Sequence, residues 1–204
     1  MITIIDYGAG NIGSIVNMIR KVGSVAKVSS NKEEILSAEK LILPGVGSFD
    51  YGMQKLVDSD LIDAINKKVI QDKTPILGIC LGVQLMTRKS EEGNLEGLGW
   101  FDAETVKFTL NPNERLKIPH MGWNEVTCVN GSKLFNDMNE HPRFYFVHSY
   151  HLKSNNVNEV LVNSVYGYEF AAGLEKENIL GVQFHPEKSH KYGMKILENF
   201  IKYY

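Results

Sequence analysis

Apolar runs and amphipathic segments alternate through the first 90 residues of the chain. Short aliphatic and β-branched runs are typical of buried strands, and we expect strands over 1–7, 24–30, 40–49 and 74–79. The third of these continues into a loop that contains glycine and proline. Apolar residues at helical spacing predict helices between and after the strands, over 12–23, 31–39, 53–71 and 81–90. This alternation favours a parallel, doubly wound sheet with helices on its faces.

The pattern changes in the second half, where short apolar stretches are separated by turns. We expect antiparallel strands there, within 106–110, 124–129, 143–153, 160–167 and 170–186. The segment 189–204 predicts an amphipathic helix, whose apolar face carries Met194, Leu197, Phe200 and Ile201. The expected fold class is α/β: a three-layer, open, twisted, mostly parallel sheet flanked by helices, with additional antiparallel strands in the C-terminal half. No repeat or linker divides the sequence, so we expect a single domain over residues 1–204.

Composition is that of an ordinary globular protein. The 204 residues are 43% hydrophobic and 23% charged, with a formal net charge of −2. Without a basic field the chain is not expected to bind nucleic acid. No apolar run approaches the roughly 18 residues of a membrane span, and no basic segment precedes the first apolar residues. Two cysteines are too few for a disulfide scaffold. We therefore expect a cytoplasmic protein with no membrane partner. Its six histidines lack metal-ligand spacing, so no metal site is expected.

A glycine-rich stretch follows the first predicted strand. Residues 8–13 read GAGNIG and match the G-x-G-x-x-G pattern of dinucleotide-binding folds, between a strand and a helix as that pattern requires. Such sites also carry an acidic residue at the end of the second strand, which here ends in Val28, Ser29 and Ser30. We therefore favour a simple tight turn over a nucleotide site and expect no cofactor.

A cysteine lies between two glycines where the strand over 74–79 gives way to a helix. The sequence over 78–82, GICLG, is the cysteine counterpart of the nucleophile elbow. The sharp turn exposes the side chain, and the helix N-terminus favours the reactive thiolate. A small cysteine buried in a core strand explains Cys80 equally well on these residues alone. Cys128 has no such setting, and we interpret it as a core residue.

A nucleophilic cysteine needs a base and a group that orients the base. The stretch GVQFHPEKS contains both, because Pro186 favours an extended backbone at His185. Residues two apart in an extended chain face the same side, so His185 and Glu187 would project together. The carboxylate could then hold the imidazole tautomer and stabilise its charged form. The alternative is a histidine and a glutamate that are merely exposed at a strand end.

An acyl-transfer site also needs hydrogen-bond donors for an oxyanion. The backbone N–H of Leu81 directly follows Cys80 and is one candidate. Gly45, Val46 and Gly47 follow a neighbouring strand and can present further N–H groups, because sites in parallel sheets form at the carboxyl ends of the strands. Taken alone, an ordinary strand-to-helix turn explains this loop better than an oxyanion site does.

Three motifs together resemble the class I glutamine amidotransferase family: GICLGVQ over 78–84, LPGVGSF over 43–49 and GVQFHPEKS over 181–189. Two more, PHMGWNEV and FYFVHSY, are similar to motifs of the glutaminase subunits of imidazole glycerol phosphate synthases. The resemblance extends over the whole chain. Val46 and Val83 stand where sister glutaminases for chorismate-derived substrates typically carry proline and histidine. Val83 also replaces the methionine that is usual in this subunit, without affecting a chemical role.

The resemblance implies that Cys80 is the nucleophile, His185 the acid and base, and Glu187 the orienting carboxylate. Substrate glutamine would be bound by a further set of residues: Gln84, Glu92 at the α-amino group, the Gly47 region, and the backbone near Ser149 and Tyr150. The implied partner is a (β/α)8-barrel cyclase subunit, forming a heterodimer. Three residues match positions toward that partner: Asn11, Tyr145 and Lys188.

The implied activity is hydrolysis of glutamine to glutamate through a cysteine thioester. Ammonia would pass to the cyclase, which makes imidazole glycerol phosphate and aminoimidazole carboxamide ribotide in histidine biosynthesis. Two alternatives stay open. One is a stand-alone cysteine hydrolase such as a γ-glutamyl peptidase, and the other is a catalytically silent regulatory subunit.

Overall fold

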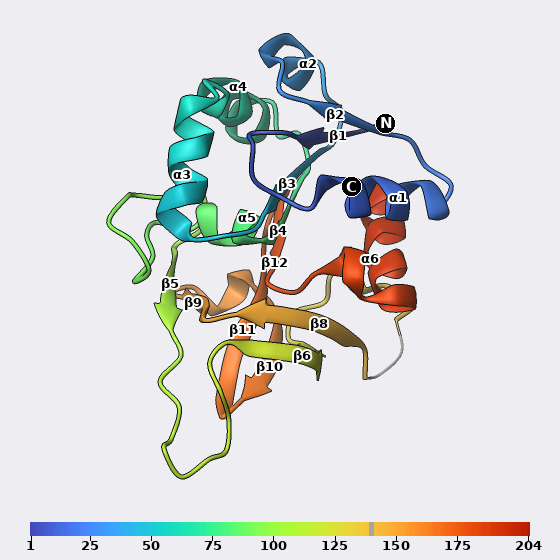
Figure 1. Ribbon diagram of the computed structural model, residues 1–204. Helices are drawn as coiled ribbons and strands as arrows, with labels where there is room; N and C mark the ends of the chain where they lie inside the picture. The colour runs from blue at the N-terminus through green and yellow to red at the C-terminus, as the bar shows by residue number, and fades with distance from the viewer. Residues whose placement is uncertain (139–140) are drawn as a thin grey trace.

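The apolar runs of the first half form parallel strands at the centre of a twisted sheet (Figure 1). The computed structural model describes residues 1–138 and 141–204. The parallel strands lie side by side in the order β2-β1-β3-β4-β12. Their bounds are Ile2–Ile5 for β1, Ala26–Ser29 for β2, Leu41–Gly45 for β3, Ile76–Cys80 for β4 and Ile179–Val182 for β12. This is the expected α/β class.

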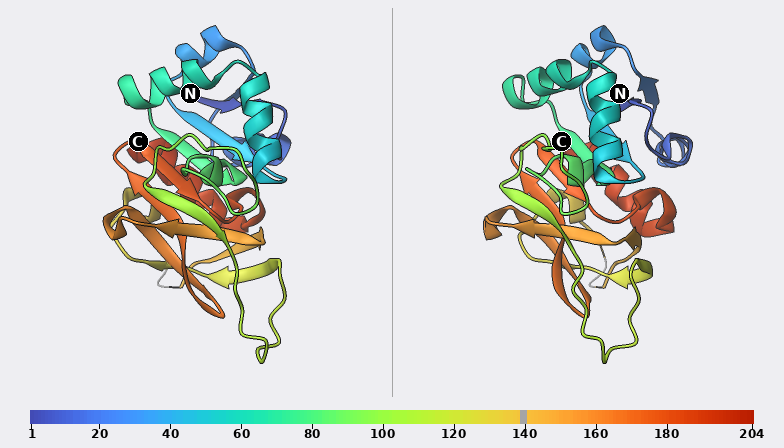
Figure 2. Two further views of the ribbon diagram at one scale, coloured as in Figure 1. Left: turned by 90° about the vertical axis from the view of Figure 1, so that its left-hand side faces the viewer. Right: turned by 60° about the vertical axis from the view of Figure 1, so that its left-hand side comes forward.

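Antiparallel strands extend the sheet beyond β12, in the order β12-β11-β10-β7, while β9 pairs with β11 and β5 pairs with β9. Their bounds are Ala103–Lys107 for β5, Thr127–Cys128 for β7, Tyr150–Ser154 for β9, Val160–Tyr166 for β10 and Tyr168–Lys176 for β11. A separate antiparallel pair is formed by β6 (His120–Glu125) and β8 (Arg143–His148), and β6 contacts β10. The long loop between β5 and β6 projects away from both sheets (Figure 2).

One strand departs from the predicted pattern. The sequence predicts antiparallel strands within 170–186, and β11 and β12 do pair antiparallel. β12 also pairs in parallel with β4, however, with Gly181 opposite Gly78 and Val182 opposite Ile79. A strand's neighbours are chosen by tertiary packing, which the local pattern of apolar residues does not contain. Because β4 and β12 point the same way, the residues that follow them meet at one edge of the sheet.

Helices cover the two faces of the parallel strands, and successive strand residues point to opposite faces. On one face α1 (Ile12–Lys21) and α6 (His190–Tyr203) pack with Ile4, Leu77 and Ile79. The second core cluster joins Leu41, Leu43 and Ile76 to the remaining helices: α2 (Lys32–Leu36), α3 (Phe49–Asp58), α4 (Ile62–Asn66) and α5 (Leu81–Leu85). Short 3-10 turns lie at Lys133–Phe135, Val157–Glu159 and Pro186–Lys188. None of the helices in the described residues is long and apolar enough to cross a membrane.

Two of the predicted helices differ most from the observed ones. The helix expected over 53–71 begins earlier and divides into α3, α4 and a π-helical turn at Lys67–Gln71. Asp60, between α3 and α4, has a φ of 56°, a left-handed conformation that interrupts a helix. The helix expected over 81–90 ends at Leu85. The carbonyls of Leu85 and Met86 accept from the N–H groups of Leu98 (2.8 Å) and Trp100 (2.9 Å) instead of from later residues of a helix.

The prediction that Cys128 is a core residue is wrong. Cys128 ends β7, the outermost strand of the sheet, and both residues of this strand are exposed. The apolar neighbours Val126 and Val129 gave the stretch the appearance of a buried strand. Only Val126 is buried, while Val129 is exposed.

Glycines allow α5 to lie directly on the strands below Cys80. A Cβ on Gly82 would meet the carbonyl oxygen of Leu43 in β3 at 1.9 Å, and one on Gly181 would meet a methyl group of Val83 at 2.1 Å. A Cβ on Gly78 would come within 2.9 Å of the backbone nitrogen of Val83. The glycines around Cys80 are therefore required by the close packing of helix on sheet.

We expect Gly82→Ala to destabilise the fold, because the new methyl group meets backbone that cannot move aside. Overpacking of this kind typically costs about 1–3 kcal/mol. Gly13→Ala is the matched control: Gly13 lies in α1 with nothing within 4 Å of the position of a Cβ, and alanine in a helix is favoured by about 0.5–1 kcal/mol. Urea unfolding measures both variants, and a Gly82→Ala protein as stable as Gly13→Ala would contradict the packing analysis.

Candidate active site

Cys80 lies at a sharp turn between β4 and α5. Its backbone has a φ of 54° and a ψ of −114°, a conformation that is strained for a residue with a Cβ. The turn places the side chain, which is 7% exposed, on the wall of a cavity of about 430 Å³. This is the backbone geometry of a nucleophile elbow, at the carboxyl end of a central strand.

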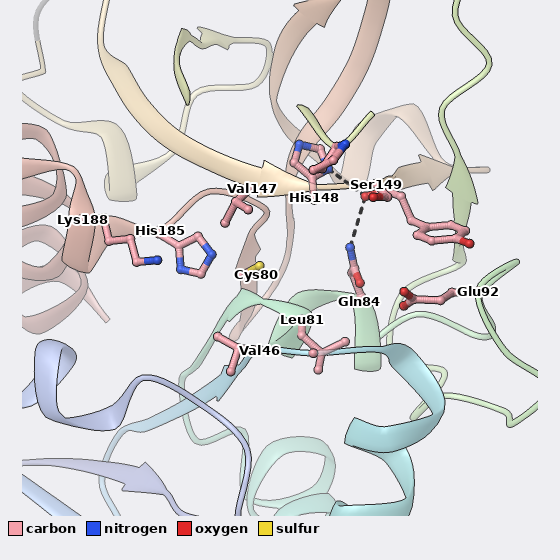
Figure 3. A pocket seen from close by; sticks show the side chains of 13 residues that line it. Val46, Cys80, Leu81, Gln84, Glu92, Val147, His148, Ser149, His185 and Lys188 are labelled. Atoms are coloured by element: carbon pink, nitrogen blue, oxygen red, sulfur yellow. Dashed lines mark hydrogen bonds between the residues drawn. The ribbon is translucent and has the colours of Figure 1, made fainter. Parts of the chain in front are cut away.

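His185 and Glu187 form a buried pair beside Cys80. Nδ1 of His185 and Oε1 of Glu187 are 2.7 Å apart, and the two side chains are 2% and 1% exposed. Nε2 of His185 has no hydrogen-bond partner among the described residues, and the ring faces the sulfur of Cys80 (Figure 3). The structure therefore brings together the three residues that the sequence singles out for nucleophilic chemistry.

The backbone that joins this pair differs from the expected extended chain. His185 is extended, but residues 186–188 form a 3-10 turn, and this turn carries the carboxylate back to the ring. The turn is tied to β8, because the N–H of His185 donates to the carbonyl of Tyr145 (2.9 Å). Ser189 adds a second tie: its hydroxyl donates to the carbonyl of His185 and accepts from the N–H of Tyr145 (3.0 Å).

The charged form of His185 is favoured by its neighbours. Burial disfavours the imidazolium, but the interactions of the ring with Cys80 and Glu187 outweigh it and raise the pKa of His185 to about 10. The imidazolium between a thiolate and a carboxylate is the arrangement that activates a cysteine nucleophile.

The loop after β3 lies against the same cavity. Val46, which is 41% exposed, and Gly47, with a φ of 107°, line the cavity together with Leu81. Gly45 does not line it: it is buried against α5, where a Cβ would meet the backbone nitrogen of Gly82 at 2.8 Å. Gly45 therefore acts through its close packing rather than by facing the cavity.

The glycine-rich stretch 8–13 packs against the loop after β3. A Cβ on Gly10, whose φ is 144°, would lie 3.0 Å from two side-chain carbons of Pro44. The hydroxyl of Tyr7, just before the stretch, donates to the carbonyl of Pro44 (2.7 Å). Burial of Tyr7, followed by the charge of Cys80, raises the pKa of this hydroxyl. The turn thus supports the loop after β3, which agrees with its interpretation as a simple tight turn.

The residues expected to bind glutamine also line the cavity: they are Gln84, Glu92, Ser149 and Tyr150. Figure 3 shows Gln84 and Glu92 on the other side of Cys80 from His185. Nε2 of Gln84 donates to the carbonyl of Tyr150 (3.2 Å) and to Oε1 of Gln183 (2.9 Å). Oε2 of Glu92 accepts a hydrogen bond from the N–H of Phe49 (2.8 Å) at the start of α3. A helix N-terminus therefore fixes this carboxylate.

The residues expected at a partner interface lie at the same end of the sheet. Nζ of Lys188 is 5.6 Å from the centre of the Tyr145 ring, and Lys188 also lines the cavity. Beside them Trp123 in β6 is 41% exposed and 6.4 Å from the Tyr145 ring. Asn11 directly precedes α1, which contacts the turn at 186–188.

Two residues of the site were not found from the sequence. Gln183 is fully buried, and its Nε2 lies 3.9 Å from the sulfur of Cys80. Its spacing of two from His185 on an extended stretch was an available signal. His148 also lines the cavity. No local pattern identified it, because its partners come from other strands.

Comparison with known proteins now identifies the family. The sequence profile of the family described as glutamine amidotransferase class-I matches residues 3–203. The chain belongs to this family. The resemblance expected from the motifs around Cys80 and His185 is thereby confirmed.

Individual relatives give the same result. The chain is 56% identical to imidazole glycerol phosphate synthase subunit HisH 2 of Methanococcus maripaludis, and 46% identical to subunit HisH 2 of Pseudomonas aeruginosa, each over 99% of both chains. Among solved structures, a putative GMP synthase protein from Thermoplasma acidophilum has a TM-score of 0.70 at 22% identity, covering 98% of this chain and 91% of that one. PurLQS from Thermotoga maritima has a TM-score of 0.70 at 19% identity, covering 99% and 97%. At such identities the structures support the fold alone.

The titration of His185 gives a testable consequence of this geometry. Its folded-state pKa of about 10 lies above the ordinary value of 6.5. The charged ring therefore contributes stability that is fully present below pH 6.5 and is lost as the pH rises toward 10. Cys80→Ala removes one of the two groups that favour the charged ring, so the pKa of His185 should fall in that variant. Imidazole 15N NMR measures both titrations, and identical curves would show that the sulfur does not act on the ring.

Proposed function

We propose that this class I glutamine amidotransferase is the glutaminase subunit of an imidazole glycerol phosphate synthase, with residues 1–204 forming one catalytic domain. The observation that carries the proposal is the buried His185–Glu187 pair facing Cys80 at a nucleophile elbow. The similarity to the HisH subunits of two organisms over nearly the full length supports the choice of subunit within the family.

In the proposed reaction the Cys80 thiolate attacks the side-chain amide carbon of glutamine. His185 donates its proton to the leaving nitrogen, the C–N bond breaks, and ammonia departs from a glutamyl thioester. Neutral His185 then takes a proton from water, and the hydroxide attacks the thioester carbon. The C–S bond breaks, which releases glutamate and restores the thiolate beside a protonated imidazole. Glu187 accepts from Nδ1 and keeps Nε2 directed at the reacting atoms.

The negative charge on the substrate oxygen requires donors on the side of the cavity opposite His185. We assign this role to the N–H of Leu81 and to the N–H groups of Val46 and Gly47, while Gly45 supports the loop by its packing on α5. Val46 and Gly47 line the cavity, and Gly47, which has no Cβ and a φ of 107°, allows the peptide group before it to rotate at low cost.

Substrate and partner occupy different parts of the site in this proposal. Gln84, Glu92 and the backbone of Ser149 and Tyr150 bind the glutamine, with Glu92 pairing with the α-amino group. Asn11, Tyr145 and Lys188 face a (β/α)8-barrel cyclase subunit in a heterodimer. Ammonia released into water at neutral pH would mostly become ammonium, which is not a nucleophile, so the partner receives it directly. A biosynthetic role of this kind belongs in the cytoplasm.

Cys80→Ala should abolish glutamine hydrolysis while leaving the fold and partner binding intact, because it removes the nucleophile and little buried surface. The variant complex should still make the cyclase products from added ammonium salt. Glutamate release and product formation are measured side by side. Cys128→Ala is the control and should keep full activity, since Cys128 lies on an exposed edge strand. Residual glutaminase activity in Cys80→Ala would refute the assignment of the nucleophile.

The isolated chain should be a poor glutaminase, and the cyclase with its ribotide bound should raise turnover strongly. One missing oxyanion donor typically costs about 100- to 1000-fold in rate, and partner contacts can restore it by favouring the turned loop. The effect should appear in kcat rather than in KM for glutamine. Steady-state kinetics of the chain alone, with cyclase, and with cyclase plus ribotide test this.

Each other outcome of these kinetics has a meaning. Equal turnover in the three conditions would favour a stand-alone cysteine hydrolase such as a γ-glutamyl peptidase. No glutamate in any condition would favour a catalytically silent regulatory subunit.

A further inference from the structure

Two buried histidines connect strand β6 to the wall of the cavity. Nδ2 of Asn124 lies 3.2 Å from Nε2 of His120, and Nδ1 of His120 lies 3.0 Å from Nε2 of His148. Nδ1 of His148 in turn lies 2.7 Å from the carbonyl oxygen of Tyr150. His120 and His148 are 3% and 7% exposed. None of these side chains has a role in the proposed glutaminase reaction.

The direction of every hydrogen bond in this row follows from its last member. A carbonyl oxygen only accepts, so Nδ1 of His148 carries the proton. A neutral imidazole has a single N–H, so Nε2 of His148 accepts and Nδ1 of His120 donates to it. Nε2 of His120 then accepts from the amide of Asn124.

The surroundings agree with this direction and with neutral rings. The amide nitrogen of Asn124 also donates to the carbonyl of Val165 (2.7 Å), and its oxygen accepts from the N–H of Glu125 (2.9 Å), which fixes the orientation of the amide. Burial lowers the pKa of His120 to about 4 and that of His148 to about 3. Both rings are therefore uncharged at neutral pH.

We propose that Asn124, His120 and His148 form a one-way hydrogen-bond chain that holds the Tyr150 carbonyl in place on the wall of the glutamine pocket, with both imidazoles locked as Nδ1–H tautomers. The three are positioning residues, and the proposal rests on the glutaminase function proposed above. Free histidine does not prefer the Nδ1–H tautomer. The hydrogen bonds of this chain therefore require a proton position on both rings that side-chain packing alone would not select.

The Tyr150 carbonyl is linked to Cys80 through two glutamine side chains, Gln84 and Gln183. It also accepts from Nε2 of Gln84 (3.2 Å; Figure 3). The second proton of that nitrogen goes to Gln183, whose own amide nitrogen is 3.9 Å from the sulfur of Cys80. If His148 stops donating, the Tyr150 peptide can rotate and Gln84 loses a fixed acceptor. The wall that meets the substrate would then be less ordered before binding.

Aromatic packing keeps the ring of His120 in the required plane. It stacks between Tyr166, with centroids 4.1 Å apart, and Phe146, with centroids 4.8 Å apart. β6 presents alternate residues to the other side, where Met121 and Trp123 are exposed. The hydrogen-bond chain therefore connects β6, a strand with one exposed face, to the wall of the pocket.

The tautomers can be measured directly on the full wild-type chain at pH 7. A long-range 1H–15N correlation spectrum distinguishes protonated from unprotonated ring nitrogens. We expect Nδ1 protonated and Nε2 unprotonated in both His120 and His148, with the signals assigned by single substitution of each histidine. A proton on Nε2 of either ring would overturn the proposal. This measurement requires no variant to remain active and does not depend on the proposed function.

Kinetics with the cyclase present test the positioning role. His148→Leu should raise KM for glutamine about tenfold, the effect of one lost hydrogen bond, with a smaller change in kcat because binding rather than chemistry is affected. His148→Asn should recover most of the affinity, because its amide nitrogen takes the place of ring Nδ1.

His151→Leu is the matched control. His151 is also 7% exposed, packs on the same Phe108 ring and makes hydrogen bonds through both nitrogens, but it does not line the cavity. It should lose stability without a change in KM. An equal rise in KM for the two leucine variants, no rise in His148→Leu, or no recovery in His148→Asn would overturn the positioning role. Absence of glutamine hydrolysis by the wild-type complex would instead refute the proposed function.

Discussion

The parallel pairing of β4 with β12 is the constraint on which the site depends. The two strands are far apart in sequence, yet the pairing sets Val182 beside Ile79 and so brings the chain after β12 to the turn that carries Cys80. His185 is close enough to face the sulfur only because both strands end at the same sheet edge. In an antiparallel arrangement the histidine would leave the sheet at the opposite edge. Gly78 and Gly181, directly paired, leave room for α5 above both strands.

The same geometry buries charge. Glu187 and His185 are almost fully enclosed, and Oε2 of the carboxylate has no hydrogen-bond partner among the described residues. Burying ionised groups generally costs stability, and the positive φ of Cys80 adds backbone strain. Buried charge and backbone strain, which both lower stability, are therefore concentrated at Cys80, His185 and Glu187. This is expected where a fold supports chemistry.

Local sequence predicted the first half of the fold and the cluster of Cys80, His185 and Glu187, since strand periodicity, glycine spacing and the elbow motif are all short-range signals. The pairing of His185 with Glu187 was also predicted, although a 3-10 turn rather than an extended chain produces it. The parallel pairing of β12 with β4, the exposure of Cys128 and the pair of His120 and His148 were not predicted. Each depends on which strand lies beside which, and the two histidines are 28 residues apart. Cross-strand neighbours of this kind leave no period in a single sequence.

The two walls of the cavity differ in how firmly they are held, and this bears on how a partner could act. The Tyr150 carbonyl accepts two hydrogen bonds, one from Gln84 and one from His148. His148 is held in turn by His120, whose ring is stacked between aromatic side chains. The loop after β3 is anchored at Pro44 by Tyr7, but beyond that point Val46 is exposed and Gly47 has the conformational freedom of glycine. A contact from outside can therefore reorient the loop after β3, to which we assign the oxyanion donors, at little cost, whereas the wall around Tyr150 resists change. If the proposed roles hold, such a division predicts that partner binding acts on the rate of the chemical step, because the wall proposed to bind glutamine is already ordered in the isolated chain.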